Sequence, residues 1–343
     1  MKNITFRVAV LLTFFMLLLS GLHAQMKKAG QSGMTYLAIS LSARESAMGN
    51  ASVAAVRGVQ ALFYNPALLT KFEGIGAAVN QVNWLADTKI YSAGVVYSLA
   101  RYGTLGLDLV YMDYGKIVGT ERVDKSIDQR GYRITGDLNI QDYAIGLAYA
   151  YAVNERFSFG TKIKIVHEDL GNAPIAVKAI DESQGLYEYE DRSWKLTDWG
   201  FDFGGYYEVG FKNLAFAVAF QNYSGDMQYW SEAFQMPLTI RMGLAMNLAE
   251  ILMPDNDQIA INTAIDALHP IDYTERVHIG TEFVYRNMLA LRAGYKFNYD
   301  VENFSLGAGF NFEIEGYAAS IDYAYTNAEF FGHVDRFSLN FSF

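Results

Sequence analysis

The sequence predicts an all-β protein: a transmembrane antiparallel β-barrel of about 14 strands with an N-terminal plug-like segment. The last third of the chain, Pro237 to Phe343, alternates apolar and polar residues in one run after another. Because successive side chains of a strand point to opposite faces, each run forms one apolar and one polar face. The runs are about 10–13 residues long, which suits tilted strands that cross a bilayer. Lipid does not tolerate open sheet edges, so such a sheet is expected to close.

The polar face of these runs is rich in charged residues and glycine, as expected for the interior of a barrel. Leu238, Ile240 and Met242 share one parity, whereas Thr239 and Arg241 share the other. The charges predicted to face the interior form either a salt-bridge network that fills the barrel or a site that attracts a polar solute or peptide end. They are Arg241, Arg292, Lys296, Lys162, Lys164, Glu282 and Asp322.

Composition supports a barrel and excludes several classes of function. The 343 residues include 24 Tyr and 23 Phe, as expected for aromatic girdles at the two membrane interfaces. The absence of Cys excludes disulfides, thiol chemistry and Cys-based metal sites. A net charge of −10 argues against nucleic acid as a partner, because nucleic-acid-binding surfaces are basic.

The chain divides into three parts. Residues 1–24 have a basic start (Lys2 and Arg7) and a short apolar run from Val8 to Leu19, which predicts a signal peptide; a retained anchor is the alternative. Residues 25–72 break the alternation and are rich in small residues. We expect them to form a segment that packs in the lumen as a plug, with a solvated tail as the alternative. Residues 73–343 form the predicted barrel.

Fourteen strands are expected in this last part, and the connections between them alternate in length. Tight turns fall on even-numbered connections, and three long loops (117–139, 170–193 and 224–236) fall on odd-numbered ones; the medium-length connection 249–257 and the short turn 299–300 are exceptions. Outer-membrane barrels have this asymmetry, with short turns on the periplasmic side. The expected strands are 74–84, 89–99, 104–116, 140–152, 156–169, 194–209, 213–223, 237–248, 258–267, 273–285, 288–298, 301–314, 317–325 and 333–343.

Two of the long loops carry candidate contacts for a partner or ligand. The acidic loop 170–193 contains Tyr187 and Tyr189, and loop 224–236 contains Tyr229, Trp230 and Phe234. The acidic loop is either a hydrated external loop or a docking surface for a protein or a divalent cation. Loop 117–139 is expected to pair with it as a lid, through Arg122, Lys125, Arg130 and Arg133.

No residue pattern points to catalysis. The histidines after the leader, His167, His269, His278 and His333, lack metal-site spacing. His278 is expected to be a girdle or lumen residue, and Gly307-x-Gly309 alternates on a strand and thins the lumen wall. We therefore expect no enzymatic activity, no cofactor and no metal site.

Two motifs ahead of the first strand resemble a known family. Residues 43–51 read Ala-Arg-x-x-Ala-Met-Gly-x-Ala, and residues 61–67 read Ala-Leu-Phe-Tyr-Asn-Pro-Ala. This pair is similar to the N-terminal signature of PorV/PorQ family proteins, which belong to the wider group of FadL-like outer-membrane barrels. The sequence departs from the family at Arg57-Gly58, where acidic residues are common. The matching motif residues include Arg44, Met48, Gly49, Asn65 and Pro66.

The resemblance implies a role in type IX protein secretion. Such a barrel binds or shuttles secreted cargo or partner subunits at the outer membrane of a Gram-negative, Bacteroidota-like bacterium. Its partners are then outer-membrane lipid and secretion-system proteins or cargo. The alternative is a FadL-like uptake channel for hydrophobic small molecules, for which Tyr229, Trp230 and Phe234 are the best candidates to line a pocket.

Overall fold

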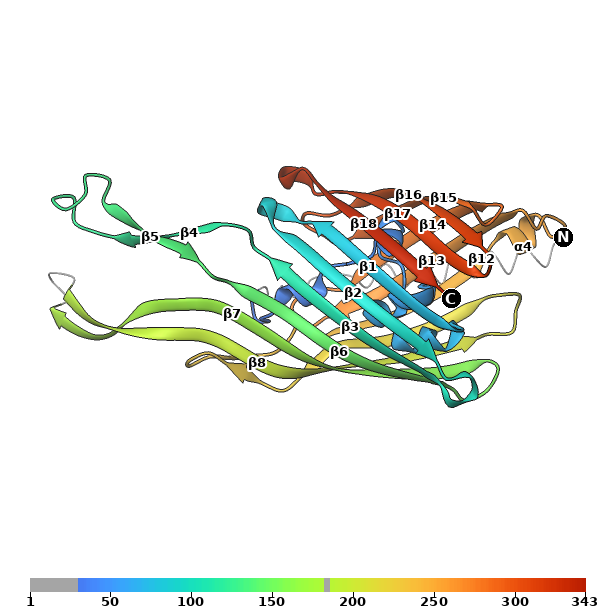
Figure 1. The fold of residues 1–343 in the computed structure, drawn as a ribbon, viewed down its shortest axis with the longest axis horizontal. Coiled ribbons are helices and arrows are strands. Elements are labelled where there is room, and N and C mark those ends of the chain that lie inside the picture. Colours follow the sequence, from blue (N-terminus) through green and yellow to red (C-terminus); the bar gives the residue numbers. More distant parts are fainter. Residues whose placement is uncertain (1–29, 182–185) are drawn as a thin grey trace.

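Fourteen antiparallel strands form a closed barrel in the computed structural model, which describes residues 30–181 and 186–343. Neighbours in the sequence are neighbours in the wall, and the ring closes where β1 (Ile75–Asn83) pairs with β18 (His333–Ser342) (Figure 1). The other barrel strands are β2 (Lys89–Ser98), β3 (Thr104–Asp113), β6 (Gln141–Ala152), β7 (Phe157–Asp181), β8 (Leu186–Glu208), β9 (Ala215–Ser224), β12 (Thr239–Asn247), β13 (Ile259–Pro270), β14 (Arg276–Tyr285), β15 (Leu289–Phe297), β16 (Phe304–Ile314) and β17 (Tyr317–Asn327).

Burial alternates along the strands and confirms which face is apolar. In β3, Leu107 is 55% exposed on the outside, whereas its neighbours Gly106 and Asp108 are buried in the interior. Most barrel strands have 9–12 residues, which suits a tilted crossing of a bilayer. The wall therefore presents a continuous apolar outer belt and an inner face of polar and small residues.

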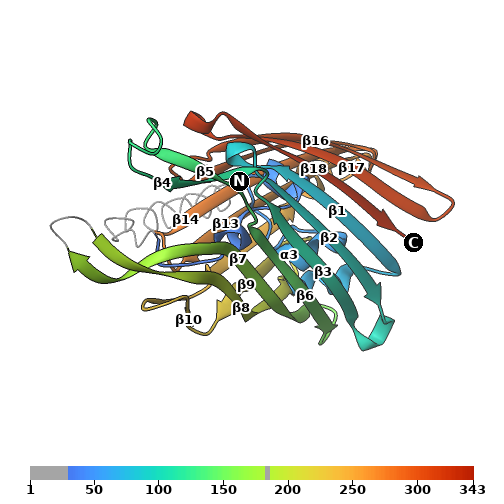
Figure 2. The same cartoon turned by 60° about the vertical axis from the view of Figure 1, so that its left-hand side comes forward.

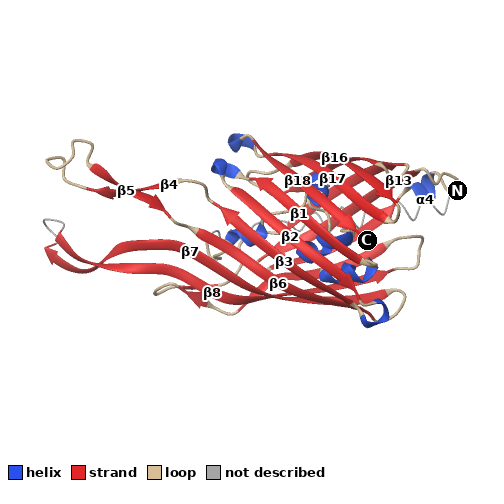
Figure 3. Ribbon diagram, in the orientation of Figure 1, coloured by secondary structure: helices blue, strands red, loops and turns tan. Residues whose placement is uncertain are grey.

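The two ends of the barrel differ. At one end the strands are joined by short turns and by α4 (Ala249–Leu252). At the other end, long hairpins project beyond the wall (Figures 1 and 3). We call these the short-turn end and the hairpin end. This asymmetry follows the predicted alternation of connection lengths.

The three predicted long loops contain strands, which corrects their description as loops. Residues 117–138 form the hairpin of β4 (Ile117–Arg122) and β5 (Tyr132–Leu138), and β10 (Met227–Gln228) pairs with β11 (Ala233–Phe234). The predicted loop 170–193 is mostly an extension of β7 and β8, which reach 25 and 23 residues. The β4–β5 hairpin is exposed along nearly its whole length, so it lacks the apolar/polar alternation that revealed the barrel strands, whereas Met227 of β10 is buried.

The N-terminal segment runs through the lumen as short helical turns. In both cartoon views it lies within the ring of strands (Figures 1 and 2). Its elements are η1 (Thr35–Ala38), α2 (Ala43–Ala47), η2 (Gly58–Gln60), α3 (Ala61–Tyr64) and η3 (Pro66–Lys71). The remaining turns are η4 (Leu85–Asp87), η5 (Ala100–Tyr102) and η6 (Glu329–Phe331).

The segment enters at the hairpin end, where Ser32 bridges to Gln235, and leaves at the short-turn end before β1. None of the helices in the described residues is long and apolar enough to cross a membrane. The predicted signal peptide, residues 1–24, lies outside the described residues.

Candidate functional site

Arg44 links the N-terminal segment to the barrel wall. Its guanidinium donates two hydrogen bonds of 2.8 Å to the carboxylate of Glu282 on β14 and one of 2.8 Å to Glu45. Burial by itself lowers the pKa of Arg44, but Glu282 and Glu45 raise it above its ordinary value, so the side chain stays charged. Arg292 extends the network, donating to Glu282 at 2.8 Å and to Asp322 at 2.6 Å. The predicted interior charges on this side therefore form a salt-bridge network.

Met48 and Gly49 fit against two glycines of the wall. Met48 is 1% exposed, and Gly49 has a φ of 63°, a conformation that side chains disfavour. A Cβ built on Gly294 would lie 2.0 Å from the Gly49 nitrogen, and one built on Gly280 would lie 2.1 Å from the Met48 carbonyl oxygen. The segment approaches β14 and β15 so closely that the wall has no room for side chains there.

Asn65 and Pro66 form the turn that starts η3. The Asn65 side chain accepts a hydrogen bond from the Ala67 nitrogen at 3.1 Å and donates one to the Val53 carbonyl at 2.9 Å. Pro66 stands at the first position of η3, where its missing N–H costs no hydrogen bond. Gly204 lies against the Asn65 side chain, since a Cβ there would meet its Oδ1 at 2.0 Å.

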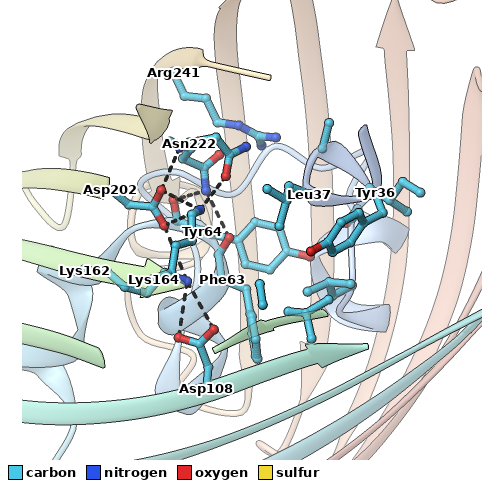
Figure 4. Close-up of a pocket in the computed structure, with 17 residues that line it drawn as sticks. Tyr36, Leu37, Phe63, Tyr64, Asp108, Lys162, Lys164, Asp202, Asn222 and Arg241 are labelled. Atoms are coloured by element: carbon cyan, nitrogen blue, oxygen red, sulfur yellow. Dashed lines mark hydrogen bonds and ion pairs between the residues drawn. The ribbon is translucent and has the colours of Figure 1, made fainter. Parts of the chain in front are cut away.

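A second charged cluster lies on the opposite wall. Lys164 donates to Asp202 at 2.8 Å and also to Asn222, and Lys162 lies 3.3 Å from Asp108 and donates to the Leu62 carbonyl at 2.7 Å. Figure 4 shows these side chains side by side on the wall, opposite Tyr36 and Leu37 of the N-terminal segment. Here β8 and β9 are locally out of register, and the backbone N–H of Asn222 donates to Asp202 at 2.7 Å.

A small cavity of about 50 Å³ separates this cluster from the segment. Leu37, Ile39, Phe63 and Val110 supply apolar lining, and the charged cluster supplies polar lining. Arg241 also lines the cavity, and its Nε and Nη1 have no hydrogen-bond partner within the described part of the chain.

Around and beyond this cavity, the hairpin end of the lumen is apolar. The cluster combines residues of the N-terminal segment with the ends of several strands, and Trp84, Leu196 and Phe234 pack against it. Its buried members are Met34, Tyr36, Leu41, Val82, Ile90, Val110, Met112, Ala144, Val166, Met227, Met236, Ala328 and Val334.

Two larger chambers open at the short-turn end. One, of about 680 Å³, lies between the segment and β14–β18; the other, of about 420 Å³, lies against β8, β9, β12 and β13. Arg44, Arg57 and Gly58 line both chambers. The segment therefore separates a small cavity near the hairpin end from open space at the short-turn end.

Tyr229 and Phe234 come together at the hairpin end, whereas Trp230 does not join them. The two rings stack at 5.5 Å, and the Tyr229 hydroxyl donates to Glu168 at 2.6 Å. Trp230 instead lies under Arg192, whose guanidinium carbon is 4.6 Å from the ring centroid. Tyr187 and Tyr189 belong to β8, and their side chains lie outside the described residues.

The predicted lid between the basic and acidic loops is wrong for the residues whose partners are seen. Arg133 pairs with Glu121 at 2.7 Å and Arg130 pairs with Asp128 at 2.8 Å, both within their own hairpin. The side chain of Arg130 lowers the pKa of Asp128 to about 2. Local partners are available along a ribbon, so these arginines do not need the acidic hairpin.

Sequence reasoning missed several interior residues that complete these networks. Asp108 and Asp202 pair with the lysines, and Asp266 accepts backbone hydrogen bonds from Ser52 and Val53 at 2.7 and 2.9 Å. The signal that could have revealed them is parity, because each stands at an inward position of an alternating run. His278 is buried in the lumen as predicted, hydrogen-bonded to the Asn50 carbonyl and the Tyr299 hydroxyl.

The fold is similar to those of several solved structures, among them a transporter and a channel. The toluene transporter TbuX of Ralstonia pickettii is 14% identical, with a TM-score of 0.54 over 88% of this chain and 96% of that chain. The monoaromatic hydrocarbon channel CymD is 14% identical, with a TM-score of 0.52 over 89% and 98%. A FadL homologue of Pseudomonas aeruginosa is 11% identical, with a TM-score of 0.52 over 89% and 98%.

No protein-family model and no curated protein sequence matches the chain. The similarity to solved structures shows a FadL-like β-barrel fold, and nothing in the comparisons points to the PorV/PorQ family in particular.

Proposed function

We propose that this protein is a non-enzymatic uptake barrel for small hydrophobic compounds, embedded in the lipid of the outer membrane of a Gram-negative bacterium. The observation that carries the proposal is the apolar interior at the hairpin end, with its small cavity beneath Tyr36–Leu41. In this orientation the hairpin end faces outward and the short-turn end faces the periplasm, as in other outer-membrane barrels.

The fold supports the same assignment. The similar structures include a toluene transporter and a monoaromatic hydrocarbon channel. A small apolar compound transfers favourably from water into an apolar interior, so the outer half of the lumen is suited to collect it. The charged clusters below this region favour water or polar partners, so the compound is held near the outer mouth.

We further propose that the segment 25–72 acts as a plug. Its described part, from residue 30, occupies the lumen between the small cavity and the two chambers at the short-turn end. A compound in the cavity therefore reaches the periplasm only when part of the segment moves. Arg44, Met48, Gly49, Asn65 and Pro66 hold the segment in place in this proposal.

The proposal is tested by filling the cavity. Ala144 lines it and is 2% exposed. The larger side chain of Ala144→Leu should fill the cavity and weaken binding of the compound. We expect uptake of radiolabelled toluene to fall about tenfold in cells that rely on this protein, which corresponds to a loss of ~1.4 kcal/mol of binding free energy. Ile145→Leu is the matched control, since Ile145 faces outward and is 46% exposed. Equal uptake by both variants would contradict the proposal.

A second candidate function is supported by the projecting hairpins. The last regular pair in the wall is Asp169 with Lys195; β7 continues 12 residues past it to Asp181, or roughly 40 Å of strand, and β8 begins 9 residues before it at Leu186. Such a ribbon is suited to contact another protein, such as secreted cargo or a secretion-system subunit in a Bacteroidota-like bacterium. Affinity purification from native membranes separates the two candidates: co-purified cargo or secretion subunits favour this one, and bound hydrophobic compound without protein favours uptake.

A further inference from the structure

Arg57 stands between the two chambers at the short-turn end. It lines both the chamber of about 680 Å³ and the chamber of about 420 Å³, and its side chain is exposed to them. Within the part of the chain that the structure describes, it makes no hydrogen bond and no ion pair. Arg44, the other arginine shared by both chambers, is fully engaged by Glu282 and Glu45.

Glu282, Glu45 and Asp322 are already occupied by donors other than Arg57. Both oxygens of Glu282 accept hydrogen bonds from Arg44, and Arg292 and Asn262 add one each. Glu45 accepts from Arg44 and Ser42. Asp322 accepts from Arg292 through one oxygen and from Ser320 and Asn340 through the other. Arg57 therefore keeps five N–H donors without a hydrogen-bond partner among the described residues, although the carboxylate of Glu313 also lines the larger chamber.

The larger chamber combines this cation with an apolar wall. Val59, Phe72, Val284 and Met288 supply its apolar lining. Amide and hydroxyl groups lie between them, from Gln60, Asn287, Asn311 and Ser342. A volume of about 680 Å³ is within the range of ligand pockets. Such a wall suits an occupant that has apolar side chains, amide groups and one anionic end.

The occupant must come from the short-turn side. Between the chambers and the hairpin end, residues 61–69 pack into a dense cluster with the wall, in which Leu62 and Leu69 are at most 1% exposed. A compound that enters from outside does not reach Arg57 while this packing is intact. If the short-turn end faces the periplasm, as in the proposed function, the chamber is open to periplasmic molecules.

We propose that the larger chamber binds the carboxyl-terminal end of a periplasmic protein, with Arg57 pairing with the terminal carboxylate. A guanidinium binds a carboxylate through two parallel hydrogen bonds, which gives both affinity and orientation. The positive charge of Arg44 repels that of Arg57 and lowers the pKa of Arg57. A bound anion would offset this repulsion. The inference shares with the proposed function only the assignment of the short-turn end to the periplasm, and it does not depend on the uptake of hydrophobic compounds.

The test measures binding of peptides to the purified full-length protein in detergent. The probes are a pool of N-acetylated tripeptides of apolar residues with free carboxyl ends, the same pool with amidated ends, and hexanoate. We expect the free-acid pool to bind, and amidation to weaken the binding about tenfold or more, as for loss of a charge-assisted pair. Arg57→Gln should cause a loss of the same size for the free-acid pool and no further loss for the amidated pool.

Arg101→Gln is the matched control, because Arg101 is exposed in η5 at the same end of the barrel and lines neither chamber. It should leave binding unchanged within about twofold, since a distant exposed charge is screened. Thermal unfolding of each variant checks that the barrel is intact. Equal binding of acid and amide pools, or equal binding by Arg57→Gln and wild type, would overturn the inference. Binding of hexanoate as tight as that of the peptides would overturn the protein partner in favour of a small carboxylate.

Discussion

Glu282 is the residue on which the contact between the N-terminal segment and the wall most depends. It is 2% exposed and accepts hydrogen bonds from Arg44 of the segment and from Arg292 of β15. One carboxylate thus compensates two buried guanidinium groups. A buried charge that loses its partner is costly, because neither water nor another acceptor replaces it.

Replacing Glu282 with Gln is therefore expected to destabilise the protein. Arg44 keeps Glu45 and Arg292 keeps Asp322, but each loses one of its two anionic partners, and we expect a loss of up to about 3–5 kcal/mol, the usual cost of breaking a buried ion pair from one side. The measurement is the thermal unfolding of purified protein in detergent. Glu121→Gln serves as control, because its pair with Arg133 is exposed and should be worth less than about 1 kcal/mol. Similar losses in both variants would show that Glu282 does not anchor the segment.

Glu302, in the connection between β15 and β16, makes stability depend on pH. Burial opposes its ionisation, but Lys296 at 2.8 Å and Arg336 at 3.2 Å lower its pKa from 4.5 to about 2. The stabilisation from its ionised form is complete above about pH 4.5 and is lost as the pH falls toward 2. It amounts to roughly 3 kcal/mol at most.

We expect the unfolding temperatures of wild type and Glu302→Gln to differ at pH 7 and to converge near pH 2. The glutamine of Glu302→Gln has no carboxylate to protonate, so the unfolding temperature of the variant should depend less on pH between 7 and 2. A difference between the two proteins that stays constant from pH 7 to pH 2 would contradict this role for Glu302.

At the scale of elements, the N-terminal segment and the wall are matched in shape. Wherever the segment comes closest, the wall presents glycine, as at Gly294 against Gly49 and at Gly307 against Ala47. Gly205, on β8, has no atom within 4 Å of a Cβ built there. The wall therefore offers both a site where an added methyl group collides and a matched site where it does not.

Gly294→Ala is expected to displace the segment, because the new methyl group would lie 2.0 Å from the Gly49 nitrogen and 2.1 Å from the Met48 carbonyl carbon. Overpacking of this kind costs about 1–3 kcal/mol. If the segment seals the lumen, cells should also admit more of a hydrophilic antibiotic. Gly205→Ala should change neither stability nor permeability. Normal permeability in a destabilised Gly294→Ala protein would mean that the segment packs in the lumen without sealing it.

The strands that the sequence predicts lie between lipid and the lumen, whereas β4 and β5, which it does not predict, lie in water. All fourteen barrel strands separate lipid from the lumen, so alternation predicts them, and it also places Arg292 and Lys296 inside. The β4–β5 ribbon has water on both faces, so its sequence carries no such pattern. The alternation predicts whether a side chain faces lipid or the lumen, but it does not predict which residue that side chain contacts across the lumen. For that reason the pairing of Arg44 with Glu282, 238 residues apart, could not be predicted.

At the scale of the whole molecule, β7 and β8 each have a part that belongs to the barrel wall and a part that projects beyond it. The regular pairing of β7 with β8 continues from the barrel to Asp169 and Lys195 and is interrupted beyond them. Both wall neighbours, β6 and β9, pair only with the barrel portion. The projecting part is therefore an addition that the closed ring does not need.

Replacing residues 171–193 with an Asn-Gly turn should leave the barrel folded, because this dipeptide favours the tight turn that connects two strands. The unchanged measurements should be the far-ultraviolet circular dichroism and the heat-dependent mobility in gel electrophoresis. Toluene uptake should persist if the protein is an uptake barrel, whereas surface display of secreted cargo should fail if it serves secretion. Loss of the folded barrel would show that the hairpin belongs to it.

The seam between β1 and β18 bears on the order in which the barrel is expected to assemble. Gly76 pairs with Ser342, and Ile75 and Phe343 exchange hydrogen bonds of 2.8 and 3.1 Å, so the seam joins the first and last strands of the chain. The segment that precedes β1 is threaded lengthwise through the finished cylinder. The wall packs closely against this segment, as at Gly280 and Gly294, so inserting the whole segment into a closed barrel would be hindered. We therefore expect the barrel to close around a segment that is already in position, with the β1–β18 seam forming after the segment has docked.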